Sequence, residues 1–163
     1  MSGTPGGLLD LLTLGTALGC GLMGGVFFAF STFVMPALAR LPAAQGIAAM
    51  QSINVAAITP SFMGPLFGTA AACALLAACA ISTWPRTAAV LVVAGSLLYL
   101  AGTLLVTMVF NVPRNAALAA VDPLGAEAAN LWAGYVSGWT AWNHVRAAAA
   151  IAAAGLFTIA LLR

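Results

Sequence analysis

One apolar segment of the chain, from Thr87 to Pro113, reads TAAVLVVAGSLLYLAGTLLVTMVFNVP and contains no Asp, Glu, Lys or Arg. A helix needs about 20 consecutive apolar residues to cross the hydrocarbon core of a bilayer. The segment therefore predicts a membrane-spanning helix. Two further uncharged segments, Leu11–Ala39 and Leu41–Pro85, precede it and extend the same prediction to the first half of the chain.

The composition agrees with an integral membrane protein. Hydrophobic residues make up 63% of the 163 residues and charged residues only 5%, whereas soluble domains contain about 45 to 50% apolar residues. We expect a single all-α domain, residues 1–163, that is a bundle of four transmembrane helices. Prolines, which interrupt helical hydrogen bonding, mark the breaks. The expected spans and their prolines are 8–35 (Pro36), 61–83 (Pro60), 87–111 (Pro85 and Pro113) and 139–162.

The connection between the first two spans carries a helical pattern of its own. Five residues share one face of it, namely Ile47, Met50, Gln51, Asn54 and Ile58. We expect an additional interfacial helix here. It either lies on the lipid headgroups or covers a site to which Gln51 and Asn54 contribute.

Four spans place both termini on one side of the membrane and the two long connections, residues 36–60 and 112–138, on the other. Most polar residues fall on the side of these connections, so we expect the functional site there.

The charge of the chain argues against nucleic-acid binding. The net charge is only +2, and a few scattered arginines do not form the basic patch that nucleic acid requires. We expect the protein to lie in the lipid bilayer of the plasma membrane. The sequence leaves open whether it forms a homo-oligomer.

A polar stripe runs along the third expected span. Because a helix turns about 100° per residue, one arc collects Ser96, Tyr99, Thr103, Thr107 and Asn111. Polar groups in hydrocarbon need protein partners or water. The stripe is therefore expected to face the bundle interior, either as hydrogen bonds between helices or as the lining of a cavity.

A second polar cluster, residues 132–146, reads WAGYVSGWTAWNHVR and holds three of the chain's four tryptophans and its only histidine. Helical phase places His144 on the arc of the small residues Ala147 and Ala148, which predicts that it points into the bundle. Arg146 falls nearly opposite, with Trp139, and is expected to reach toward the membrane interface. Asn143 lies between the two arcs.

Four motifs together resemble the anthrone oxygenase-like membrane family, and the resemblance covers nearly the whole chain. The motifs are FSTFVMPAL (30–38), MQSIN (50–54), NVPRN (111–115) and WTAWNHVR (139–146). Characterised fungal members of the family oxidise polyketide anthrones to anthraquinones without an established cofactor. The resemblance marks as signature positions Asn111, Asn115, Trp139, Asn143, His144 and Arg146.

The resemblance implies a membrane-embedded, cofactor-independent monooxygenase that acts on a planar, anthrone-like aromatic with O2 as co-substrate. Such an enzyme needs a base, donors for a developing oxyanion and an apolar slot. We expect His144 to be the base, because imidazole titrates closest to neutral pH. The expected oxyanion donors are Asn143, Asn111 and either Arg114 or Arg146. The remaining expected substrate contacts are Trp139, Trp142, Tyr135, Gln51, Asn54, Asn115 and Thr107.

Two other function classes stay open on the sequence. A non-catalytic quinone- or lipid-binding protein would use the same slot but consume no O2. A haem- or metal-dependent oxidase would show a visible absorption band or a bound metal. The sequence argues against a metal site, since it has one histidine and no Cys-x-x-Cys, but a haem held by His144 and a methionine is not excluded.

Overall fold

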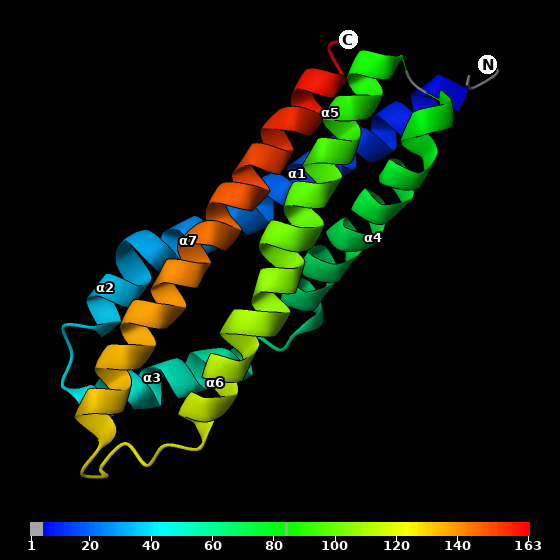
Figure 1. Ribbon diagram of the computed structural model, residues 1–163. Coiled ribbons are helices and arrows are strands. Elements are labelled where there is room, and N and C mark those ends of the chain that lie inside the picture. Colours follow the sequence, from blue (N-terminus) through cyan, green and yellow to red (C-terminus); the bar gives the residue numbers. More distant parts are fainter. Residues whose placement is uncertain (1–4, 84) are drawn as a thin grey trace.

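The computed structural model of the protein describes residues 5–83 and 85–163. Within these residues the fold is an all-α bundle (Figure 1). Four helical stretches are long and apolar enough to cross a membrane, namely Gly7–Leu38, Pro60–Ala80, Arg86–Ala119 and Ala128–Ala160. The predicted fold class and number of spans are confirmed.

The first and third spans each combine α-helical and π-helical segments. The first consists of α1 (Pro5–Ala29), η1 (Phe30–Val34) and α2 (Met35–Leu38). The third consists of α5 (Arg86–Leu97), η2 (Leu98–Leu105), η3 (Thr107–Asn111) and α6 (Val112–Ala119). The second span is α4 (Pro60–Thr83) and the fourth is α7 (Ala128–Ala160).

Two prolines expected to end helices lie inside these spans instead. Pro36 and Pro113 are each the second residue of an α-helix that follows a π-helical segment, so each sits in the first turn of that α-helix. A proline is tolerated in a first turn, because the N–H that it lacks has little use there. The third span therefore continues to Ala119 rather than ending near residue 111.

The fourth span begins at Ala128, well before the predicted start at residue 139. Gly134 and Gly138 weaken helix propensity in this stretch. The helix forms because Trp132 and Tyr135 are buried against other elements, and packing of a helix face outweighs propensity.

The fourth helix is the centre of the bundle. It packs against α1, α5 and η2 along its length, while α4 packs against α1 and α5. Figure 1 shows the beginning of α1 and the C-terminus at one end of the bundle, in keeping with the predicted topology. At the other end α3 (Ala43–Ala56) runs across the bundle and contacts α2, α6 and α7.

The polar stripe of the third span faces inward, as predicted, since all five of its residues are buried. Tyr99 donates a hydrogen bond to the Leu66 carbonyl of α4 at 3.2 Å, and Thr103 donates to the Arg146 carbonyl of α7 at 3.2 Å. These residues join helices. Thr107, further along the stripe, lines a cavity.

The additional helix between the first two spans is α3, and its buried residues are Gly46, Ile47 and Met50. A Cβ on Gly46 would lie only 2.7 Å from Cζ2 of Trp132, so glycine allows α3 to approach α7 closely. Whether α3 lies at a membrane interface stays a prediction.

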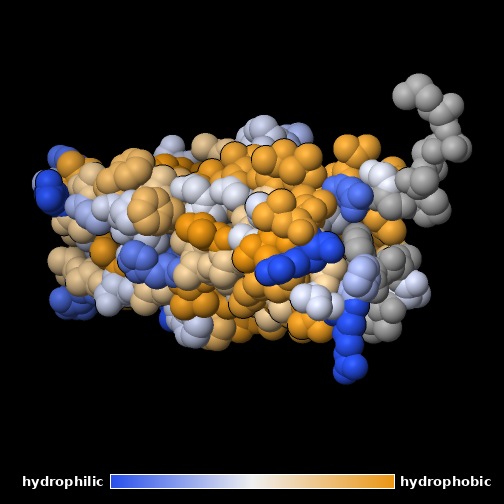
Figure 2. All heavy atoms as spheres, turned by 90° about the horizontal axis from the view of Figure 1, so that it is seen from above, coloured by the Kyte–Doolittle hydropathy of each residue, from blue (hydrophilic) through white to orange (hydrophobic). Residues whose placement is uncertain are grey.

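The lipid-facing character of the bundle is visible on its surface. In the space-filling view of Figure 2, apolar side chains cover much of the face shown. Leu8, Leu18 and Val90 are among many large apolar residues that are exposed. A soluble protein would rarely expose so much contiguous apolar surface, so lipid contact is the physical explanation.

Candidate functional site

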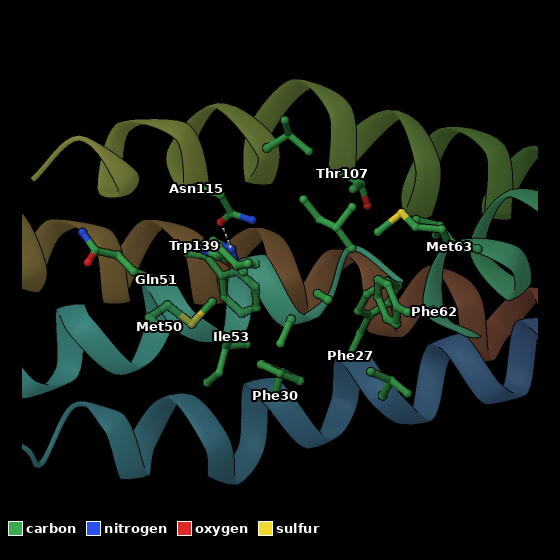
Figure 3. Close-up of a pocket in the computed structure, with 18 of the residues that line it drawn as sticks. Phe27, Phe30, Met50, Gln51, Ile53, Phe62, Met63, Thr107, Asn115 and Trp139 are labelled. Atoms are coloured by element: carbon green, nitrogen blue, oxygen red, sulfur yellow. Dashed lines mark hydrogen bonds between the residues drawn. The ribbon is translucent and has the colours of Figure 1, made fainter. Parts of the chain in front are cut away.

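A cavity of about 790 Å³ lies where α3 crosses the bundle (Figure 3). This is within the size range of small-molecule sites. Most of its lining is apolar, including Phe27, Phe30, Met50, Ile53, Phe62 and Met63. The polar residues in the lining are Gln51, Asn54, Thr107, Asn115 and Arg146. The cavity thus offers an apolar ligand a few polar contacts.

The rim of the cavity is also apolar. Val55 and Ile58 line it although each is 74% exposed. Val112, at the start of α6, lines it and is partly exposed as well. An apolar ligand therefore meets apolar side chains from the mouth inward.

Arg146 is the most unusual residue of the lining. It is only 5% exposed. Its Nη1 donates to Thr107 Oγ1 at 3.2 Å and its Nη2 to Asn143 Oδ1 at 2.5 Å. Cζ lies 4.2 Å from the centre of the Phe27 ring and 5.2 Å from that of Trp139, distances at which aromatic faces attract a guanidinium.

No carboxylate in the described part of the chain neutralises Arg146. The chain has three acidic residues, Asp10, Asp122 and Glu127, and all three are exposed. The Arg146 Nε is buried and makes no hydrogen bond to a described residue. Burying a charge that lacks a counter-charge is costly, so an anionic group in the cavity would find a strong partner here.

Asn143 holds Arg146 in place. It is fully buried. Its Oδ1 accepts the hydrogen bond from Arg146, and its Nδ2 donates to the Phe27 carbonyl and to Ser31 Oγ, both at 2.6 Å. These bonds use the polar capacity of the amide on protein groups. Asn143 therefore positions Arg146 and ties α7 to α1 and η1.

Asn115 provides a second polar group in the cavity. Its Oδ1 accepts hydrogen bonds from Tyr135 Oη at 2.9 Å and from Trp139 Nε1 at 2.8 Å. An indole N–H can only donate, so the atom that faces it must be the amide oxygen. The orientation of the amide follows, and Figure 3 shows its nitrogen on the side away from Trp139.

Gln51 and Asn54 belong to the wall that α3 forms. Gln51 Nε2 donates to the Leu118 and Val121 carbonyls at 2.9 and 3.0 Å, which fastens α3 to the end of α6. Asn54 lies beside the Tyr135 hydroxyl, but its Nδ2 makes no hydrogen bond of good geometry with the described residues. Both residues line the cavity, and their contact with a substrate stays a prediction.

The predicted orientation of His144 and Arg146 is wrong, because the structure reverses it. His144 is exposed and faces a separate surface cavity of about 360 Å³, which Met35 and Thr140 also line. Small residues occur on both faces of α7, since Ala147 is buried and Ala148 is exposed. The positions of small residues therefore do not indicate which face of α7 is buried.

Five other predicted residues lie outside the lining of the large cavity, namely Asn143, described above, and Asn111, Tyr135, Trp142 and Arg114. Asn111 is buried and donates to the Trp139 carbonyl at 3.2 Å. The Tyr135 hydroxyl donates to Asn115 Oδ1 and so helps to hold that lining residue in place. Trp142 stacks on Phe110, with ring centres 3.6 Å apart. Arg114 donates to the Phe110 carbonyl at 2.7 Å.

Phe27 and Phe62 line the cavity but were not predicted from the sequence. Their rings meet edge to face, with centres 6.4 Å apart. In apolar helices that contain many phenylalanines, the sequence does not show which of them line a cavity. Their neighbourhood becomes visible only when α1 and α4 are brought together.

A family model described as anthrone oxygenase matches residues 55–156. The chain belongs to the anthrone oxygenase family. The matched segment runs from the cavity rim at Val55 past Arg146 and so contains Asn115, Trp139 and Asn143. No curated protein and no solved structure matches the chain significantly.

Proposed function

We propose that this family member oxidises an anthrone-type substrate, a flat fused-ring ketone with an acidic methylene group, to the corresponding quinone inside the 790 Å³ cavity. The observation that carries the proposal is the buried Arg146, which lines an apolar cavity without a carboxylate partner in the described chain. A substrate that becomes an enolate supplies the missing anionic oxygen.

The first step is proton loss from the methylene carbon. The negative charge of the resulting enolate rests largely on the carbonyl oxygen. A guanidinium fixed in a poorly hydrated cavity stabilises this oxygen more than it stabilises the neutral ketone, because charges interact more strongly at low dielectric. Arg146 therefore acidifies the bound substrate. The described lining residues include no carboxylate or imidazole, so the proton passes to water.

The second step is the reaction with O2. The enolate gives one electron to O2, and the substrate radical and superoxide combine, with uptake of a proton, to a hydroperoxide at the former methylene carbon. Loss of water from this hydroperoxide leaves a second carbonyl. One anthrone and one O2 thus yield one quinone and one water, and one atom of O2 stays in the product.

The aromatic residues beside Arg146 suit a flat substrate. Phe27 and Trp139 both present ring faces near the guanidinium, and Phe30 packs against Trp139 with ring centres 6.0 Å apart. Aromatic faces attract the faces and edges of other rings. They would hold the fused rings with one oxygen directed at Arg146.

The proposal is tested with purified protein in detergent or nanodiscs, an anthrone and isotopically heavy O2. The expected result is O2 uptake faster than autoxidation in protein-free buffer, with one heavy oxygen atom in each quinone formed. A rate equal to that of the buffer would overturn the proposal. Binding of a quinone without O2 uptake would support a non-catalytic quinone-binding protein instead.

A further inference from the structure

We infer that Cys20 of α1 and Cys73 of α4 form a redox site, in which an organic hydroperoxide dissolved in the bilayer oxidises the two thiols to a disulfide between the helices. The site lies in the apolar core of the bundle, outside the lining of the large cavity. It does not depend on the proposed function. Its oxidation joins two helices that contribute to the cavity wall.

The two thiols face each other across the contact between α1 and α4. Both side chains are completely buried, and the Cys20 thiol is hydrogen-bonded to the Cys73 thiol. In the structure the two residues are thiols rather than a disulfide. A disulfide requires two cysteines whose side chains point toward each other at close range. Thiols in hydrogen-bonding contact are already oriented in this way, so oxidation needs little movement of either helix.

Close packing fixes the spacing of the two helices around the thiols. A Cβ on Gly19, the residue before Cys20, would overlap Thr69 Oγ1, so glycine lets the two backbones approach each other here. Thr69 lies about one helical turn before Cys73 on α4. Tyr99 of η2 packs against the same place, since its hydroxyl is hydrogen-bonded to Thr69. The thiols are therefore held in contact by their neighbours.

The burial of the site determines which oxidants can reach it. Thiols in apolar surroundings form thiolate poorly and are protected from polar oxidants in water. An organic hydroperoxide dissolves in hydrocarbon and so collects around the helices. It reaches the thiols when local fluctuations open the contact between α1 and α4. Lipid hydroperoxides belong to this chemical class, so the reaction needs no substrate in the large cavity.

The reaction balances with the hydroperoxide as the oxidant. The sulfur of one thiol attacks the terminal oxygen and the O–O bond breaks, which gives a sulfenic acid. The proton of this thiol goes to the departing alkoxide, which leaves as an alcohol. The second thiol then attacks the sulfur of the sulfenic acid, the S–O bond breaks, and the oxygen leaves as water with the second thiol proton. The two electrons that the thiols lose reduce the O–O bond.

The disulfide acts on the cavity through the two helices. Phe27 lies seven residues after Cys20, and Leu66 lies seven residues before Cys73. Each interval is about two helical turns, roughly 10 Å. Both Phe27 and Leu66 line the large cavity. A covalent bond at this distance limits how far α1 and α4 can separate at the cavity wall.

The test uses the whole protein in lipid nanodiscs, first reduced and then treated with cumene hydroperoxide in the absence of an anthrone. Mass spectrometry of the digested protein should identify a disulfide between Cys20 and Cys73, and a reductant should remove it. The oxidised protein should unfold at a temperature higher by about 5 °C or more, because the disulfide closes a long loop. Cys73→Ser, which replaces sulfur by oxygen, should show neither effect.

The matched control is Cys79→Ser, which makes the same change at another cysteine of α4 and should keep both effects. Hydrogen peroxide should form the disulfide more slowly than cumene hydroperoxide, after correction for the rates of both with a small thiol in water. Absence of the disulfide in the folded wild type, or a disulfide to Cys79 in its place, overturns the inference. Equal corrected rates contradict access through hydrocarbon, and an unchanged unfolding temperature contradicts the restraint on the two helices.

Discussion

The two faces of α7 carry polar residues that are close in sequence and different in surroundings. Asn143 and Arg146 face inward, where Phe27, Ser31 and Thr107 supply hydrogen-bond partners. His144, between them in sequence, is exposed beside the smaller surface cavity. In a membrane bundle apolar residues cover both faces of a helix, so the inward face is identified by the partners of its polar groups.

This contrast assigns the chemistry to the Arg146 face. The family resemblance alone marked both residues and gave no means of choosing between them. The large cavity, the aromatic faces and the Arg146 guanidinium, which has no carboxylate partner among the described residues, all lie on one side of the helix. Four substitutions can break or sharpen the distinction between the two faces.

Arg146→Met is expected to have the largest effect. It removes the charge while keeping an unbranched apolar side chain, and should lower turnover of an anthrone by about 10²- to 10³-fold, the loss typical of an oxyanion donor. The fold should survive, because no buried charge is left unpaired. Steady-state O2 uptake measures the effect. Arg114→Met, which removes an arginine outside the cavity, is the matched control, and equal losses in both variants would contradict the assignment.

Asn143→Ala is expected to have the next largest effect. It leaves the Phe27 carbonyl and the Arg146 Nη2 without their partner, so the free energy of unfolding should fall by about 1 to 3 kcal/mol. Because Arg146 loses its support, kcat should fall more than KM rises. Thermal unfolding in detergent and steady-state kinetics check the two effects. A stable variant with wild-type kcat would show that Asn143 does not position Arg146.

Trp139→Phe removes one of the two donors to Asn115 but keeps an aromatic face beside Arg146. Asn115 then loses one of the two bonds that hold its side chain in the cavity wall, so the apparent affinity for an anthrone should fall by about two- to tenfold, the effect of one ordinary hydrogen bond, while kcat stays nearly constant. The ratio of KM values for the variant and the wild type measures this. A large loss of kcat with unchanged KM would assign Trp139 to the chemical step instead.

His144→Ala is expected to have the smallest effect. An exposed residue outside the cavity should alter turnover by less than about twofold, in keeping with the small effects of most surface substitutions. Loss of a general base would instead cost about 10²- to 10⁴-fold. A loss of turnover of that size in a folded variant would show that the reactive centre lies on the His144 face of α7.

The sequence was sufficient for the architecture and for part of the site. The first three spans follow from uncharged apolar segments. The inward face of the third span was predictable because its few polar residues, from Ser96 to Asn111, lie on one arc of the helix. The motifs also indicated the family and marked as signature positions Asn115, Trp139 and Arg146, which line the cavity, although the predicted orientation of Arg146 was wrong. The part of the cavity wall formed by Phe27 and Phe62 could not be predicted, since it depends on contacts between helices that are distant in the sequence.

The phase of α7 was missed for a related physical reason. Alanines at 147 and 148 differ in burial but not in chemistry, so they could not define the packed face. The buried face is instead the one where Trp132, Tyr135, Trp139, Asn143 and Arg146 follow each other at helical spacing. Pro113 misled the prediction of a helix end, because the π-helical segment before it was not visible in the sequence.

The most direct test of the role of Arg146 is the absorption spectrum of an anthrone bound without O2. If Arg146 stabilises the enolate, the visible band of the enolate should appear on binding to the wild type and to His144→Ala, and be absent with Arg146→Met. A band that persists in the Arg146 variant, or one that disappears in the His144 variant, would contradict the account.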